Sequence, residues 1–202
     1  MQPKNNKRTI RAWAFFDWAN SAYNLVITST IFPAYYTAIT TTKEHGDRVM
    51  FFGHSFVNTA LSNYVLSAAY LIIVLLLPIL TSIADYKGNK KSYMQMFTLL
   101  GSVSCCCLYF FKADTLEFSM ICFGLAAIGY CGGFVFYNSY LPQIATLDQQ
   151  DSVSAKGFIY GFTGSIVVQI VCFVVVLAPQ LFGMKDDDLP ARVSFIIVFV
   201  WC

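Results

Sequence analysis

The sequence predicts an all-α fold, a polytopic membrane helix bundle, and its composition and hydropathy are the main reasons. Of the 202 residues, 57% are hydrophobic and 12% are charged, whereas an ordinary soluble domain is about 45–50% apolar and about 25% charged. The mean hydropathy is +0.60. The lipid bilayer is therefore an expected partner. With a net charge of +2 and no groove-sized basic patch, nucleic acid is not an expected partner.

Apolar runs long enough to cross a bilayer core, about 20 residues each, recur along the chain. They place helices near residues 13–39, 61–83, 93–111, 118–140, 158–182 and 193–202. The last run has about half the length that a spanning helix needs, so we expect a truncated sixth helix and a chain that is a fragment. The predicted organisation is a basic N-terminal tail, residues 1–12, followed by a transmembrane bundle, residues 13–202.

The distribution of cations predicts the orientation of the bundle, because Lys and Arg favour the cytoplasmic side of short loops. A cytoplasmic N-terminus places these cations inside: Lys4, Lys7, Arg8, Arg11, Lys87, Lys90, Lys91 and Lys156. It places these outside: Lys43, Arg48, Lys112, Lys185 and Arg192. The N-terminus is therefore predicted to be cytoplasmic.

Residues that hold cofactors or metals do not form a recognisable pattern. The cysteines all lie in apolar stretches and read as small core residues. The two histidines, His45 and His54, are nine residues apart and lack a zinc-binding spacing. No phosphate-binding glycine loop is present, which disfavours transport driven directly by ATP. We expect no cofactor, no metal and no catalytic residue.

A tight, charged connection follows the second predicted helix, in the stretch PILTSIADYKGNKKSYM, residues 78–94. Asp85 ends a helix, Gly88 permits a left-handed turn, and Lys90 and Lys91 face the anionic lipid surface. One interpretation is a turn that only fixes topology. The stretch also resembles the signature loop of the major facilitator superfamily at these four residues. Thr81 stands where that signature usually has glycine, and Tyr86 and Asn89 replace basic residues.

Three further stretches resemble the vacuole effluxer-like branch of that superfamily, the autophagy-related 22 type permeases. They are FDWANSAYN at 16–24, FYNSYLPQIA at 136–145 and SVSAKGFIYGFTGS at 152–165. The resemblance implies a transporter of about twelve helices in two six-helix halves. This chain would be the N-terminal six-helix half of a major facilitator fold, and its partner would be the missing C-terminal half. The family also implies amino acid export, and the Asp85–Lys91 loop would form part of a cytoplasmic gate.

One carboxylate, Asp17, lies inside the first apolar run. At 3.6 residues per turn, Asp17, Ser21, Asn24 and Thr28 form one polar stripe, and Asn20 flanks it. A charge at the bilayer centre costs at least about 2.5–3.5 kcal/mol, so the stripe should face the bundle interior or a water-filled cavity.

Three interpretations of Asp17 remain open. It could pair with a cation of a cytoplasmic loop, such as Lys90 or Lys156, and lock one conformation. It could gain and lose a proton during transport, or it could meet the cationic group of a substrate such as an amino acid.

Two other groups of residues have both a structural and a functional interpretation. Asn138, at the end of the fourth helix, is either a helix-terminal amide or a gate and substrate contact. Glycines at 157, 161 and 164 of the fifth helix, and at 129, 132 and 133 of the fourth, offer small-residue faces for close helix packing.

The predicted function is secondary active transport of a small solute, with amino acids and protons as candidate substrates, by alternating access. The expected location is a bacterial inner membrane, with a vacuolar membrane as the alternative. A half-size assembly or regulatory module that does not transport is the competing hypothesis. An intramembrane enzyme would need a second buried acid, base or nucleophile, and no such cluster is visible.

Overall fold

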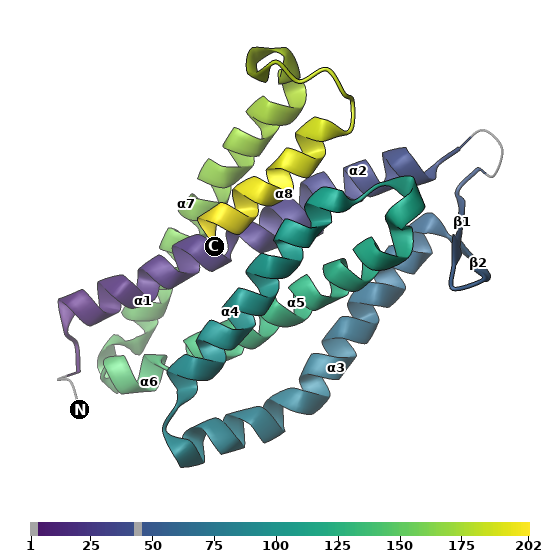
Figure 1. Cartoon of the computed structure of the whole chain (residues 1–202). Helices are drawn as coiled ribbons and strands as arrows, with labels where there is room; N and C mark the ends of the chain where they lie inside the picture. The colour runs from purple at the N-terminus through teal and green to yellow at the C-terminus, as the bar shows by residue number, and fades with distance from the viewer. Residues whose placement is uncertain (1–3, 43–45) are drawn as a thin grey trace.

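The computed structural model of the chain describes residues 4–42 and 46–202, and helices account for most of it (Figure 1). The predictions for the first three residues of the tail and for Lys43, Glu44 and His45 lie outside the described residues. The α-helices are α1 Lys7–Asn20, α2 Ile31–Thr40, α3 Asn58–Lys87, α4 Lys90–Cys107, α5 Leu116–Asn138, α6 Leu141–Ile144, α7 Gln150–Leu177 and α8 Leu189–Trp201. A π-helix, Tyr23–Thr30, precedes α2, and short 3₁₀ turns span Leu108–Phe110, Ala113–Thr115, Leu147–Gln149 and Pro179–Phe182.

Among the described residues, four helical stretches are long and apolar enough to cross a membrane. They are Asn58–Lys87, Lys90–Phe110, Ala113–Ile144 and Leu147–Leu177. The final predicted run forms the 13-residue helix α8. The all-α membrane bundle is therefore confirmed, whereas the count of six spanning helices is not.

The first predicted helix begins earlier and is less regular than expected. Asn6 caps α1, because its side-chain oxygen accepts a hydrogen bond from the backbone N–H of Arg8 at 2.9 Å. The helix therefore starts at Lys7, inside the predicted tail. The chain then passes through the π-helix into α2, which continues in nearly the same direction (Figure 1).

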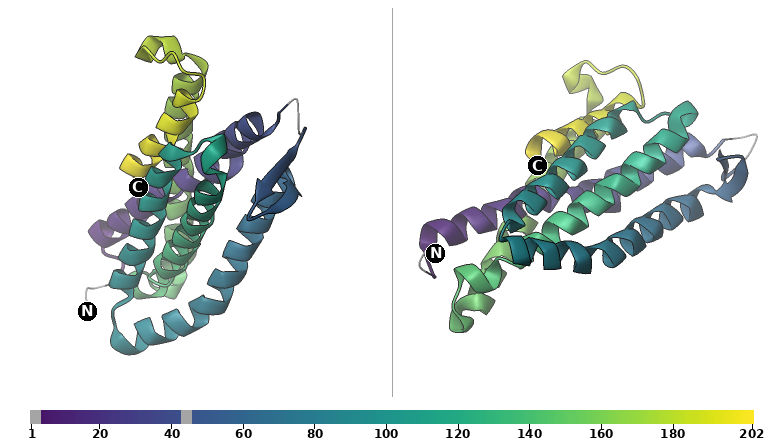
Figure 2. Two further views of the ribbon diagram at one scale, coloured as in Figure 1. Left: turned by 45° about the vertical axis from the view of Figure 1, so that its right-hand side comes forward. Right: turned by 60° about the horizontal axis from the view of Figure 1, so that its bottom comes forward.

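The connections gather at two ends of the bundle. Figures 1 and 2 place the start of α1, the α3–α4 turn and α6 at one end. The α4–α5 connection and a β-hairpin lie at the other end. The cations at the start of α1 and in the α3–α4 turn therefore share one end, and which side of the membrane this end faces stays a prediction.

The β-hairpin was not predicted from the sequence. Strands β1, Arg48–Phe51, and β2, His54–Val57, pair antiparallel, with Phe51 opposite His54. The two turn residues, Phe52 and Gly53, have φ angles of +47° and +79°, as a tight two-residue hairpin turn requires. The carboxylate of Glu117 on α5 accepts a hydrogen bond from the backbone N–H of Phe52 at 2.9 Å and ties the hairpin to the bundle.

Helices α4 and α5 pack closely because glycines face each other. A Cβ atom on Gly129 would collide with the backbone of Gly101, and one on Gly132 would collide with the ring of Phe97. The core beyond this contact is aromatic, since Phe32 of α2 stacks on Phe123 of α5 with ring centroids 4.0 Å apart. The small-residue face predicted on the fourth helix is thus confirmed at these two glycines.

Candidate functional site

Asp17 is buried between α1 and α7, with 5% of its surface exposed. Its Oδ1 accepts a hydrogen bond from the hydroxyl of Ser21, one turn further along, at 2.7 Å. Its Oδ2 has no hydrogen-bond or ion-pair partner among the described residues. The side chain faces Gly161 of α7, where an added Cβ would lie 2.8 Å from the Asp17 carboxyl carbon.

A cavity of about 240 Å³ opens beside this carboxylate, between the first helical segment, α5 and α7. Its polar lining consists of Asp17, Ser21, Asn24, Ser29 and Ser165. The apolar lining is mainly aromatic and consists of Leu25, Tyr130, Phe134, Phe158 and Phe162. Three of the four members of the predicted stripe therefore line one cavity.

The fourth predicted member, Thr28, lines a different cavity, with Phe32 and Tyr36. The assignment of Thr28 to the stripe was wrong, because the backbone from Tyr23 to Thr30 is a π-helix. Its hydrogen bonds reach five residues back instead of four, as the bond from the N–H of Ile31 to the carbonyl of Val26 shows. The shift brings Ser29 into line with Asn24 in place of Thr28.

Side-chain hydroxyls satisfy the carbonyls of this irregular segment. Ser29 Oγ donates to the carbonyl of Asn24 at 2.9 Å, and Thr30 Oγ1 donates to that of Leu25 at 2.8 Å. Thr30 Oγ1 also lies 2.8 Å from Oε1 of Gln169, which links the π-helix to α7. Pro33 follows in the first turn of α2, where its missing N–H costs least.

The structure does not show the predicted pairing of Asp17 with a loop cation. Lys90 instead forms an ion pair with Asp85 at 2.5 Å, the only ion pair among the described residues. Lys156 is exposed on α7. Asp17 is therefore a buried carboxylate that no described cation neutralises.

The two predicted asparagines outside the stripe lie elsewhere. Asn20 is buried on the other side of α1, where it borders a narrow space beside Phe97 and Gly129. Its Nδ2 has no hydrogen-bond partner among the described residues. Asn138 is exposed at the end of α5 and does not line the Asp17 cavity.

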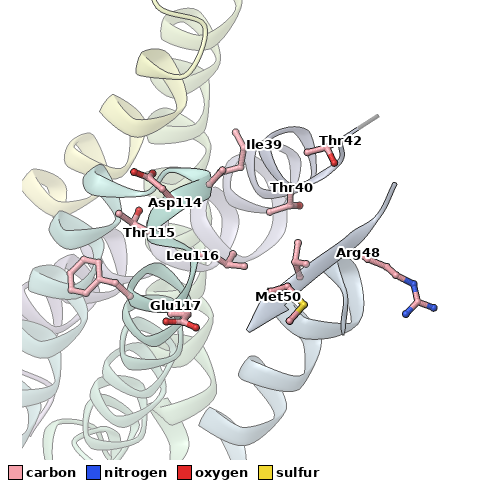
Figure 3. Close-up of a pocket in the computed structure, with 12 residues that line it drawn as sticks. Ile39, Thr40, Thr42, Arg48, Met50, Asp114, Thr115, Leu116 and Glu117 are labelled. Atoms are coloured by element: carbon pink, nitrogen blue, oxygen red, sulfur yellow. The ribbon is translucent and has the colours of Figure 1, made fainter. Parts of the chain in front are cut away.

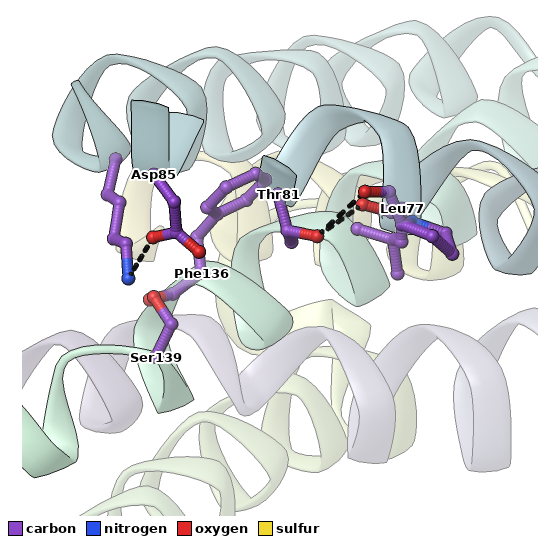
Figure 4. Close-up of polar contacts among 7 residues, drawn as sticks. Leu77, Thr81, Asp85, Phe136 and Ser139 are labelled. Atoms are coloured by element: carbon purple, nitrogen blue, oxygen red, sulfur yellow. Dashed lines mark hydrogen bonds and ion pairs between the residues drawn. The ribbon is translucent and has the colours of Figure 1, made fainter. Parts of the chain in front are cut away.

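The predicted gating loop forms the α3–α4 turn. Gly88 ends α3 with φ +67°, which glycine adopts without strain. Figure 4 shows the Asp85–Lys90 pair and the hydrogen bonds of Thr81 one turn earlier. The Thr81 hydroxyl donates to the carbonyl of Leu77 at 2.8 Å, inside its own helix. Lys91 is exposed.

The predicted small-residue face of α7 packs against α1. A Cβ on Gly157 would lie 2.5 Å from the Tyr137 hydroxyl and 2.6 Å from the Trp13 ring, and one on Gly164 would collide with the carbonyl of Trp18. Trp13 stacks on Tyr137 with centroids 4.2 Å apart, and its indole N–H donates to the Tyr137 carbonyl at 3.0 Å. Close packing of these two helices positions Asp17.

Sequence reasoning missed the aromatic part of the cavity. Phe158 and Phe162 are four residues apart, so they share one face of α7, and this spacing was the available signal. Tyr130 and Phe134 have the same spacing on α5. Ser29 could not be found without the π-helix.

A larger cavity, about 630 Å³, lies at the hairpin end of the bundle, between the end of α2, β1 and the start of α5 (Figure 3). Its charged lining residues are Arg48, Asp114 and Glu117. Arg48 extends away from the bundle in Figure 3, and Glu117 holds the hairpin turn. Because none of these groups is buried in the bundle as Asp17 is, the Asp17 cavity is the stronger candidate for a solute site.

Comparison with known proteins places the chain in a family. The model of the family described as "Vacuole effluxer Atg22 like" matches residues 5–202. The chain belongs to this family. A relative in Bacillus subtilis, named "Uncharacterized MFS-type transporter YxiO", is 31% identical over 191 residues, which cover 94% of this chain and 43% of the relative. The predicted membership of the Atg22-like branch is thus confirmed, and the chain belongs to a family of transporters.

Fungal relatives match a smaller part of the chain. Autophagy-related protein 22-1 of Aspergillus clavatus is 31% identical over 50% of this chain and 17% of its own length. Autophagy-related protein 22-2 of Penicillium rubens is 29% identical over 54% of this chain and 18% of its own length. The chain thus spans less than half the length of these curated Atg22-like relatives. No solved structure matches the chain.

Proposed function

We propose that this chain is the N-terminal half of an Atg22-like permease and that the Asp17 cavity forms one wall of its solute pathway. The observation that carries the proposal is a buried carboxylate without a cation partner among the described residues, in a polar cavity of a membrane bundle. Ionisable residues inside membrane bundles are costly and usually serve substrate or ion pathways.

The proposed solute is small, as the family resemblance implies. The cavity of about 240 Å³ would be only the part of the site that this half contributes. Amino acids are the class that the family resemblance implies, and protons are the candidate coupling ion. Both halves of such a permease contribute to the site, so the C-terminal half would complete the pathway.

Alternating access requires a structural element whose conformation differs between the state open to one side of the membrane and the state open to the other. In this proposal the α3–α4 turn, with the Asp85–Lys90 pair, is the cytoplasmic gate that contacts the other half. In this proposal the N-terminus is cytoplasmic. The membrane is a bacterial inner membrane, with a vacuolar membrane as the alternative.

The competing hypothesis, a membrane module that only assembles with partners, has less support. Small-residue faces are one means by which such a module could contact another protein. The glycine faces of α5 and α7 are instead used within the chain, against α4 and α1.

The test is solute flux through the full-length protein in proteoliposomes, with a panel of amino acids and related amines. Asp17→Asn removes the charge at nearly constant shape and should reduce the flux at least about tenfold, in line with the loss of a charged contact. Asp148→Asn, which changes an exposed aspartate in the turn after α6, is the matched control and should retain full flux. Equal flux in both variants would contradict the proposal.

A further inference from the structure

Among the described residues, the only charged side chain that lines the Asp17 cavity is a carboxylate. The lining contains no Lys, Arg or His side chain. The carboxylate uses only Oδ1 within the protein, through the hydrogen bond from Ser21. Oδ2 is left for a ligand, because no described residue donates to it or forms an ion pair with it. A positively charged group is the ligand that such a site favours most.

The aromatic rings that line the cavity also favour a positively charged ligand. Tyr130 and Phe134 come from α5, and Phe158 and Phe162 come from α7. The face of an aromatic ring carries partial negative charge and attracts cations. Phe158 and Phe162 are 74% and 62% exposed, so the rest of the described chain leaves most of their surface uncovered. A carboxylate and aromatic rings that line the same cavity are the two components of a site for an organic ammonium ion.

The three serine hydroxyls that line the cavity are already committed as donors. Ser21 Oγ donates to Asp17 at 2.7 Å, Ser29 Oγ donates to the carbonyl of Asn24 at 2.9 Å, and Ser165 Oγ donates to the carbonyl of Gly161 at 2.8 Å. Each can still accept a hydrogen bond. The serines therefore offer acceptors to an N–H donor, and the donors left in the lining are the Asn24 amide and the Tyr130 hydroxyl.

We propose that the Asp17 cavity binds the ammonium group of a small organic amine, and that this half of the site does not need a carboxylate on the ligand. The proposal rests on the function proposed above and specifies what the cavity recognises. It differs from a role for Asp17 in proton coupling alone, because a site that only carries a proton would not distinguish ligands by their amino group.

Valine and two analogues that each lack one of its charged groups test this inference. Valine carries both charged groups, isobutylamine keeps only the amino group, and 3-methylbutanoate keeps only the carboxylate. Binding of each to the purified full-length protein is measured as a ligand-induced rise in melting temperature over a concentration series, which reports affinity without transport. Valine and isobutylamine should bind, and 3-methylbutanoate should not.

Two variants locate the binding. Asp17→Asn should weaken isobutylamine binding at least about tenfold, the size expected for a hydrogen bond to a charged group. Phe162→Leu keeps an apolar side chain at an exposed position and should weaken the same binding about threefold, as loss of a cation–π contact predicts. Asp148→Asn should bind as the unaltered protein does. Each variant is compared with and without ligand, so a change in its own stability does not enter the result.

Three results would overturn the inference: 3-methylbutanoate binding as tightly as valine, no binding of isobutylamine, or isobutylamine binding that is unchanged in Asp17→Asn. Failure of the proposed function is a separate result, because it appears as absence of flux for every solute in the proteoliposome panel. If the protein transports solutes but does not distinguish ligands by their amino group, the proposed transport function would stand and the ammonium site would be refuted.

Discussion

Asp17 of α1 and Gly161 of α7 lie in direct contact, so that a Cβ atom on Gly161 would lie 2.8 Å from both Cγ and Oδ2 of Asp17. Real Cβ contacts are essentially never this short. The absence of a side chain at Gly161 therefore makes room for the carboxylate, and α7 sets the position of the charge in the cavity.

Gly161→Ala should destabilise the protein and impair transport together. Overpacking a close contact costs about 1–3 kcal/mol, and the Asp17 carboxylate or the Ser21 hydroxyl would have to move. Thermal unfolding of the full-length protein in detergent measures the first effect. Gly133→Ala is the control, because its added Cβ would meet no atom closer than 3.6 Å. Equal melting temperatures for the two variants would contradict the packing described here.

Gly101 and Gly129, which face each other between α4 and α5, should respond differently to alanine. A Cβ on Gly101 would lie 3.5 Å from the nearest atoms of Gly129 and Tyr130, an ordinary contact. A Cβ on Gly129 would collide with the Gly101 backbone. We expect Gly129→Ala to lower stability by about 1–3 kcal/mol and Gly101→Ala to lower it by less than about 1 kcal/mol. A reversed order in denaturant or thermal unfolding would refute this geometry.

Thr30 should stabilise the π-helix more than a typical helical threonine does. Thr30→Val removes the hydrogen bonds to the carbonyl of Leu25 and to Gln169. A buried polar group would then lose its partner, at a cost of about 1–2 kcal/mol in membrane interiors. Thr163→Val removes only a bond to the carbonyl of Ile159 at an exposed position of α7 and should cost less. Equal losses of stability in thermal unfolding would argue against a special role for Thr30.

The Asp85–Lys90 pair should affect gating more than stability. The Asp85 side chain is 59% exposed, and exposed ion pairs contribute about 0–1 kcal/mol. Lys90→Met should therefore change the melting temperature little and alter flux if the α3–α4 turn is the gate. Lys91→Met, at the exposed neighbouring position, is the control for melting. A large loss of stability in Lys90→Met alone would make the pair structural.

Helix content and the polar stripe were predictable because both depend on local periodicity. A run such as residues 61–83 is too apolar and too long for any other element, and α3 covers it. Asp17, Ser21 and Asn24 follow the α-helical repeat from α1 into the first turn of the π-helix, so their shared face was correct. The glycine faces were predictable for the same reason, since glycines four apart lie on one side of a helix.

The wrong predictions concern residues where the backbone departs from the α-helical repeat, or residues whose partners are set by tertiary contacts. Thr28 was misplaced because the π-helix is stabilised by side-chain bonds to carbonyls five residues back, which a fixed period cannot represent. Of the three interpretations of Asp17, the structure does not show the pairing with Lys90 or Lys156, and Lys90 instead pairs with Asp85 across the α3–α4 turn. The hairpin was missed because its strands are only four residues long, too short for a two-residue alternation to be recognised.

The most direct test of the central claim measures whether water reaches the Asp17 cavity through the full-length protein in membranes. Asn24→Cys places a thiol in the cavity lining, and Leu71→Cys places one on the exposed apolar surface of α3. The reactive species is the thiolate, which forms in water and not in hydrocarbon. A charged thiol reagent, located by peptide mass spectrometry, should label Asn24→Cys and leave Leu71→Cys unmodified. Lack of labelling at Asn24→Cys would show that the cavity is closed to water and would contradict its role as a solute pathway.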